Sequence, residues 1–140
     1  MKQSQSPAEV LLVDDASGDD TLAVLQDIAC SYPGWVRVTA LAENQGPSSA
    51  RNAGWGAATQ PFVAFLDADD SWHPDKLKIQ FGVMRDDPSI DLSGHQCVEL
   101  CNDGEVPKVS EAVVIRKVSA VELIYGNKFS TPTVMLKRQL

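Results

Sequence analysis

The sequence lacks a long apolar run and an excess of positive charge. No apolar stretch approaches the roughly 20 residues that a membrane-spanning helix needs, and the start MKQSQSPAEV lacks the apolar segment of a secretory signal. Twelve Lys and Arg face 19 Asp and Glu, which gives a net charge of −7. We therefore expect a cytoplasmic protein without a membrane span in this chain, and one that does not bind nucleic acid or anionic membranes through non-specific charge.

The sequence also lacks paired cysteines. Cys30, Cys97 and Cys101 are odd in number and contain no Cys-x-x-Cys pair, which argues against a zinc knuckle or a redox pair. We expect reduced thiols with mostly structural roles. The length of 140 residues is that of one ordinary domain, so the chain 1–140 is expected to form a single unit.

Apolar runs and amphipathic stretches alternate over the first two thirds of the chain. The apolar runs predict strands at 9–15, 36–42 and 61–66, and the stretches after them predict helices within 17–34, 48–59 and 73–87. This β-α-β-α-β-α order implies an α/β fold, with a mostly parallel sheet and flanking helices. Ligands bind such folds at the carboxyl ends of the strands.

The pattern is looser beyond Pro88. It predicts a strand at 90–100, a turn at 101–105, a strand at 112–118, a short helix at 119–127 and a final strand at 131–137.

Three carboxylates stand close together in AFLDADDSWHPDKL, directly after a predicted strand. Asp67 and Asp69 can point to a common location, because side chains alternate along a strand and the chain is leaving it there. Two such carboxylates form half of a cage for Mg²⁺ or Mn²⁺, which substrate phosphates and water would complete. The alternative is that these residues only form a turn or cap the next helix.

A second acidic pair, Asp14 and Asp15, ends the first predicted strand and so falls at the same edge of the sheet. A carboxylate there could accept hydrogen bonds from a base or a ribose, or could simply form a turn. Arg51 lies near the start of a predicted helix, where the helix dipole and the guanidinium could together bind a phosphate. The alternative for Arg51 is a surface ion pair.

Other polar and aromatic residues near these clusters have simpler interpretations. His73 could bind a metal ion, but an isolated histidine beside an acidic cluster is usually structural. Trp55 and Trp72 are expected to pack in the protein rather than to stack on a bound molecule.

The joint order of VDDAS, ENQGPSSARNAG and FLDADDSWHPDKL resembles the nucleotide-sugar-binding half of glycosyltransferase family 2, which has the GT-A fold. The resemblance runs from about Val10 to the end, where GNKFSTPTVMLKRQL is also similar to the family. Members usually begin with a strand of the type VSVIIPVYN and a helix, and they continue into an acceptor half. The resemblance therefore covers a truncated, donor-binding part of the domain.

The resemblance also implies roles for individual residues. Asp15 would contact the nucleotide base. The resemblance assigns nucleotide binding to Asp14 as well, but its motif matches the family less specifically. Asp67 would lie at the ribose and the diphosphate, Asp69 would bind the metal together with Asp67, and Arg51 would lie close to the nucleotide.

The implied reaction is transfer of a sugar from a nucleoside diphosphate, with UDP favoured, to an acceptor hydroxyl in cell wall or polysaccharide biosynthesis. The metal, Mg²⁺ or Mn²⁺, would stabilise the leaving diphosphate. The general base of the family has no counterpart in this sequence and is expected beyond Leu140. The absent first strand predicts unpaired strand edges and self-association.

Two alternatives to this function remain open. One is a non-catalytic remnant that binds a nucleotide or nothing. The other is a phosphatase of the haloacid-dehalogenase type, in which Asp67 would be the nucleophile.

Overall fold

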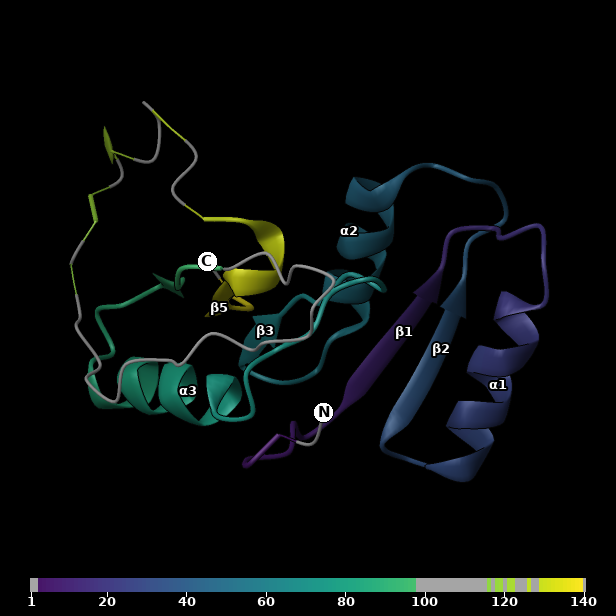
Figure 1. Cartoon of the computed structure of the whole chain (residues 1–140), viewed down its shortest axis with the longest axis horizontal. Helices are drawn as coiled ribbons and strands as arrows, with labels where there is room; N and C mark the ends of the chain where they lie inside the picture. The colour runs from purple at the N-terminus through teal and green to yellow at the C-terminus, as the bar shows by residue number, and fades with distance from the viewer. Residues whose placement is uncertain are drawn as a thin grey trace, which may run out of the picture.

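The fold alternates strands and helices as predicted over its first two thirds. The computed structural model describes residues 3–97, 116, 118–119, 121–122, 126 and 129–139. In chain order its elements are β1 (Val10–Asp14), α1 (Thr21–Ser31), β2 (Val36–Ala40), α2 (Pro47–Ala57), β3 (Phe62–Ala64), α3 (Lys76–Asp86), β4 (Leu92–Ser93), the 3₁₀ turn η1 (Thr131–Thr133) and β5 (Met135–Lys137) (Figure 1). Each of the three predicted helices forms.

Helix α2 begins slightly earlier than predicted, at Pro47 rather than at Ser48. Proline suits the first turn of a helix because its fixed φ is already helical and it has no N–H to leave unpaired. Gly46 precedes it with a φ of 85°, a conformation that favours glycine.

The described strands form two small sheets. β1 and β2 are parallel, with Val10 beside Val36 and Asp14 beside Ala40. β5 lies between β3 and β4 and is antiparallel to both. The predicted α/β class is confirmed. The expectation of mostly parallel pairing holds for β1 and β2, but not for the second sheet, because β5 runs in the opposite direction to both of its neighbours.

The later predictions are met only in part. Of the strand predicted at 90–100, Leu92–Ser93 pairs with β5, and 98–100 lie outside the described residues. The turn at 101–105 and most of the predictions for 112–118 and 119–127 also lie outside them. The final strand was predicted to begin at Thr131, but Thr131–Thr133 form a 3₁₀ turn and β5 starts at Met135.

None of the described helices is long and apolar enough to cross a membrane. Two of the three cysteines, Cys30 and Cys97, are free thiols, as expected, although both are exposed rather than buried in a structural position. Cys101 lies outside the described residues.

The main apolar core lies between α3 and the second sheet. Leu77 and Met84 of α3 pack with Met135 of β5, and Met84 is only 1% exposed. Phe62 and Phe81 meet edge to face, with ring centroids 5.6 Å apart. This core fixes α3 against β3 and β5, at the opposite end of the molecule from β1, β2 and α1 (Figure 1).

β1 and β3 are not paired with each other, and each has a strand partner on one side only in the described part of the chain. The N–H of Val10 and the C=O of Asp14 bond to the β2 side. Because backbone groups alternate in direction along a strand, those of Leu11 and Val13 face away from β2. The two sheets are therefore joined by side chains and by α2, which lies between them in Figure 1.

Glu9 is one of these joining side chains. Its Oε1 accepts hydrogen bonds from the backbone N–H groups of Thr59 (2.7 Å) and Gln60 (3.1 Å), just before β3. Its Oε2 forms an ion pair with Arg37 of β2 at 2.8 Å. Burial alone would raise the pKa of the Glu9 carboxyl, but the hydrogen bonds from Thr59, Gln60 and Arg37 outweigh burial and hold it below the usual 4.5.

We predict that Glu9→Gln lowers the free energy of unfolding by roughly 1.5–3 kcal/mol at pH 7, the range for hydrogen bonds to a charged group. Because the pKa of Glu9 is lowered by folding, its carboxylate stabilises the fold above about pH 4.5 and loses that effect as the pH falls through the folded value. The difference between wild type and variant should therefore shrink in acid.

Urea unfolding at pH 7 and at several acidic pH values measures this difference. Glu43→Gln is the matched control, because Glu43 is exposed. A Glu9 variant as stable as the control at pH 7 would contradict the assigned role.

Candidate functional site

The carboxyl end of β1 carries two aspartates with different surroundings. Asp14 is 3% exposed, and its Oδ2 accepts a hydrogen bond from the N–H of Ser17 at 3.3 Å. Its Oδ1 is buried and has no hydrogen-bond partner in the part of the chain that the structure describes. Leaving a buried oxygen of this kind without a hydrogen bond is costly, and reaching it would require a ligand to displace the groups that cover it.

Asp15 ties the end of β1 to the start of α2. Its Oδ1 accepts from the N–H of Gln45 at 2.9 Å, and its Oδ2 accepts from the N–H of Gly46 at 2.7 Å. The next residue, Ala16, has a φ of 54°, which is uncommon for a residue with a Cβ atom. The chain therefore turns sharply beside Asp15 and is held in that turn by the loop before α2.

Arg51 and Asp67 form the central contact of the site. Nη2 of Arg51 lies 2.9 Å from Oδ1 and 2.8 Å from Oδ2 of Asp67, and Nε lies 3.2 Å from Oδ1. The two side chains are 27% and 34% exposed. Arg51 comes from α2 and Asp67 from the loop after β3, so this ion pair links the helix beside the first sheet to the end of the second sheet.

The small residues of α2 allow this approach. An added Cβ at Gly54 would lie 3.4 Å from a methyl group of Val13, so α2 rests close against β1. Arg51 lies one turn earlier on the same helix. The close packing of α2 on β1 thus carries Arg51 toward the loop after β3, where it meets Asp67.

Asp69 differs from Asp67 in being exposed and without a hydrogen bond to another described residue. It lies in a turn that is closed by a hydrogen bond from the N–H of Asp70 to the C=O of Asp67, at 3.1 Å. Carboxylate oxygens are the ligands that Mg²⁺ and Mn²⁺ prefer, so Asp69 suits such a cation.

The described residues contain no group of three or more His, Cys, Asp or Glu that could hold a metal ion by itself. Any cation at Asp69 would therefore need oxygens from a bound molecule. The metal roles of Asp67 and Asp69 stay a prediction.

The neighbouring aromatic and imidazole groups are structural. The indole N–H of Trp55 donates to the C=O of Arg138 at 3.1 Å, and that of Trp72 donates to the C=O of Pro132 at 2.8 Å. Nδ1 of the exposed His73 accepts from the N–H of Asp75 at 3.2 Å. The expectation that both tryptophans pack is confirmed.

Sequence reasoning missed Lys76. This lysine is 4% exposed, lies over the Trp72 ring and donates a hydrogen bond to Gln80. The four-residue spacing of Lys76 and Gln80 was the available signal, because residues four apart lie on one face of a helix; Trp72 precedes α3.

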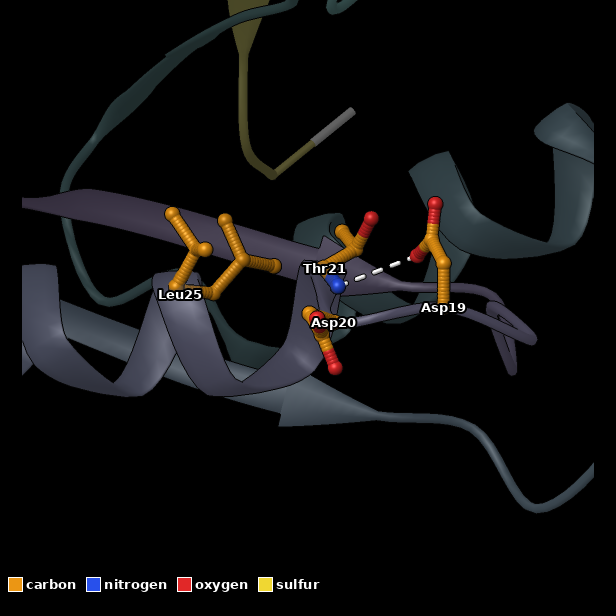
Figure 2. Close-up of a pocket in the computed structure, with 5 residues that line it drawn as sticks. Asp19, Asp20, Thr21 and Leu25 are labelled. Atoms are coloured by element: carbon orange, nitrogen blue, oxygen red, sulfur yellow. Dashed lines mark hydrogen bonds between the residues drawn. The ribbon is translucent and has the colours of Figure 1, made fainter.

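An open hollow at the start of α1 contains none of the predicted site residues. It is lined by Asp19, Asp20, Thr21, Val24 and Leu25. Figure 2 shows the N–H of Thr21 bonded to the carboxylate of Asp19, a contact of 3.0 Å. This hydrogen bond stabilises the start of α1 and does not indicate a ligand-binding site.

Comparison with known proteins gives the family. The sequence profile described as Glycosyl transferase family 2 matches residues 1–136. The chain belongs to this family, and the resemblance seen in its motifs is confirmed.

Curated relatives of the chain are also glycosyltransferases. The chain is 30% identical over 139 residues to an uncharacterized glycosyltransferase of Haemophilus influenzae, covering 99% of this chain and 54% of the relative. It is 29% identical over 140 residues to WfgD of Escherichia coli, a UDP-Glc:alpha-D-GlcNAc-diphosphoundecaprenol beta-1,3-glucosyltransferase, covering 100% of this chain and 53% of WfgD. The chain thus spans about half the length of these relatives.

A solved structure supports the fold. The crystal structure of S. aureus TarS matches with a TM-score of 0.66 and 26% identity, over 97% of this chain and 40% of that one. The GT-A type of the fold is thereby confirmed. The family match favours glycosyl transfer over the phosphatase alternative, and both oxygens of Asp67 already bond to Arg51, unlike those of a free nucleophile.

Proposed function

We propose that this chain forms the donor-binding part of a family 2 glycosyltransferase. It holds a nucleoside-diphosphate sugar with a divalent cation, for transfer of the sugar to an acceptor hydroxyl. The observation that carries the proposal is the contact of Arg51 with Asp67, because it brings the start of α2 and the acidic loop after β3 to one place.

The nucleoside is proposed to lie over the end of β1. The buried Oδ1 of Asp14 has no partner among the described residues, and it would accept a hydrogen bond from the base or the ribose if nucleotide binding uncovers it. Asp15 is held by the N–H groups of Gln45 and Gly46, and each of its oxygens keeps a lone pair for a ligand. UDP is the proposed nucleotide, in keeping with the UDP-glucose donor in the name of WfgD.

The diphosphate is proposed to lie between the start of α2 and the acidic loop. Helix N-termini attract anions, and the guanidinium of Arg51, which is paired with Asp67, lies one turn inside α2. Asp67 and Asp69 would hold Mg²⁺ or Mn²⁺, which would stabilise charge on the leaving diphosphate. We assign no general base among the described residues.

We predict that Mn²⁺ binds this chain weakly alone and at least about tenfold more tightly when UDP is present, because the diphosphate supplies the missing oxygens. Asp69→Asn should abolish this enhancement and leave the fold intact, since Asp69 is exposed. Isothermal calorimetry with Mn²⁺, in the presence and absence of UDP, measures it.

The matched control is Asp27→Asn, which removes an exposed carboxylate on α1. Equal Mn²⁺ affinity with and without UDP in the wild type would contradict the proposed metal site. No UDP binding at all would favour the alternative of a non-catalytic remnant that binds nothing.

We also propose that copies of this chain associate with each other. The edges of β1 and β3 that have no strand partner among the described residues can pair with other strands. Helix α1 adds a row of apolar side chains four residues apart, Val24, Ile28 and Tyr32, of which Val24 is 54% exposed and Tyr32 is 53% exposed. A second copy offers the same edges and the same row.

Sedimentation velocity over a range of protein concentrations should show larger species as the concentration rises. Leu11→Pro should weaken this association, because proline removes an N–H from the open edge of β1 and spares the bonds to β2. A wild-type chain that stays monomeric and melts cooperatively would overturn the proposal.

A further inference from the structure

Lys76 is a buried cation whose position needs a physical explanation. It opens α3, it is 4% exposed, and it forms no ion pair with a described carboxylate. Burial lowers the pKa of its ammonium group to about 8, so the group is still mostly charged at pH 7. An apolar side chain would fill the same space without the cost of burying a charge.

The ammonium group lies against two neutral partners. Its Nζ is 4.3 Å from the centre of the Trp72 ring and donates to Oε1 of Gln80 at 2.7 Å. A cation over an indole face is attracted to it, and the attraction grows as water is excluded. Lys76 therefore holds the Trp72 ring by its face.

Gln80 is itself fixed from the other side. Its Nε2 donates to the C=O of Thr133 at 3.0 Å and to Oγ of Ser93 at 3.2 Å. Gln80 is 6% exposed and Thr133 is 1% exposed. The amide thus anchors Lys76 to β4, which follows α3, and to η1, which lies far along the chain.

The Trp72 ring is also held at its edge, by the hydrogen bond of its indole N–H to the C=O of Pro132 at 2.8 Å. Trp72 follows Asp69 by three residues, and Asp67 precedes Asp69 by two. Arg51 holds one end of this turn at Asp67, and Lys76 with Pro132 holds the other end at Trp72. Asp69 lies between the two anchors and has no hydrogen bond to a described residue.

We propose that Lys76 is a positioning residue for Asp69, which it acts on by fixing the Trp72 ring and so the far end of the acidic turn. The inference rests on the proposed role of Asp69 as a metal ligand. It adds a residue that touches neither metal nor nucleotide but that sets where the metal-binding carboxylate lies.

The test compares Lys76→Met with Lys76→Arg and measures Mn²⁺ affinity in the presence of UDP. Methionine fills the space without a charge, so the variant should be at least as stable as wild type to urea. It should nevertheless bind Mn²⁺ with UDP about tenfold more weakly, the lower end of the effect of removing residues that orient metal ligands. Arginine keeps a cation for the indole face and should restore part of the affinity.

Lys78→Met is the matched control, because Lys78 is an exposed lysine on the same helix. A stable Lys76→Met protein with wild-type Mn²⁺ affinity in the presence of UDP would overturn the inference. If Lys76→Met does not fold, Trp72→Leu decides, because leucine removes the aromatic face that Lys76 contacts as well as the hydrogen bond to Pro132. An unchanged Mn²⁺ affinity in that variant would also overturn the inference.

The wild type separates this inference from the proposed function. If UDP does not tighten Mn²⁺ binding to the wild-type chain, the proposed metal site fails and the role of Lys76 fails with it. If UDP does tighten it, and the Lys76 and Trp72 variants behave as wild type, the metal site stands and only the positioning role is lost.

Discussion

The ion pair between Arg51 and Asp67 is the contact on which the arrangement of the site depends. The two sheets of the described structure share no strand pairing, so nothing in their backbones fixes one against the other. Helix α2 rests on β1 and reaches across to the loop after β3 through this pair. Glu9 makes the corresponding link at the other end of the strands, where it joins β1 to the residues that lead into β3.

The electrostatics of the site follow from this arrangement. Several carboxylates gather at one edge, and Arg51 compensates only Asp67, which leaves Asp69 and the buried oxygen of Asp14 without a described partner. Unpaired negative charge of this kind suits a cation with a ligand that carries hydrogen-bond donors. A nucleoside diphosphate with a bound Mg²⁺ or Mn²⁺ would supply both, as the proposed function requires.

Much of the fold could be predicted from the sequence because its early elements are locally determined. The run around Leu12 is apolar on both faces, which indicates a strand. The apolar residues Leu22, Leu25 and Ile28 recur at intervals of three residues, which indicates a helix. Pairing is different, because the partner of a strand is set by residues far along the chain. Nothing near Met135 indicates that β5 would lie antiparallel between β3 and β4.

The site shows the same division. That both acidic clusters directly follow strands was predictable, since both follow apolar runs, but β1 and β3 lie in separate sheets rather than in the single sheet that was expected. The direct pairing of Arg51 with Asp67 was not, because a surface ion pair and a phosphate ligand have the same local sequence. Lys76 was overlooked because a lysine in the first turn of a helix is usually exposed, and its burial depends on Gln80, Ser93 and Thr133.

A double-mutant cycle on UDP affinity tests most directly whether Arg51 and Asp67 form the donor site as a unit. Arg51→Met, Asp67→Asn and the double variant would be titrated with UDP in the presence of Mn²⁺ by calorimetry. If the pair acts as a unit, each single variant loses affinity and the double variant loses clearly less than the sum of the two free-energy changes. Losses that simply add, or single variants that bind UDP as tightly as wild type, would contradict the account.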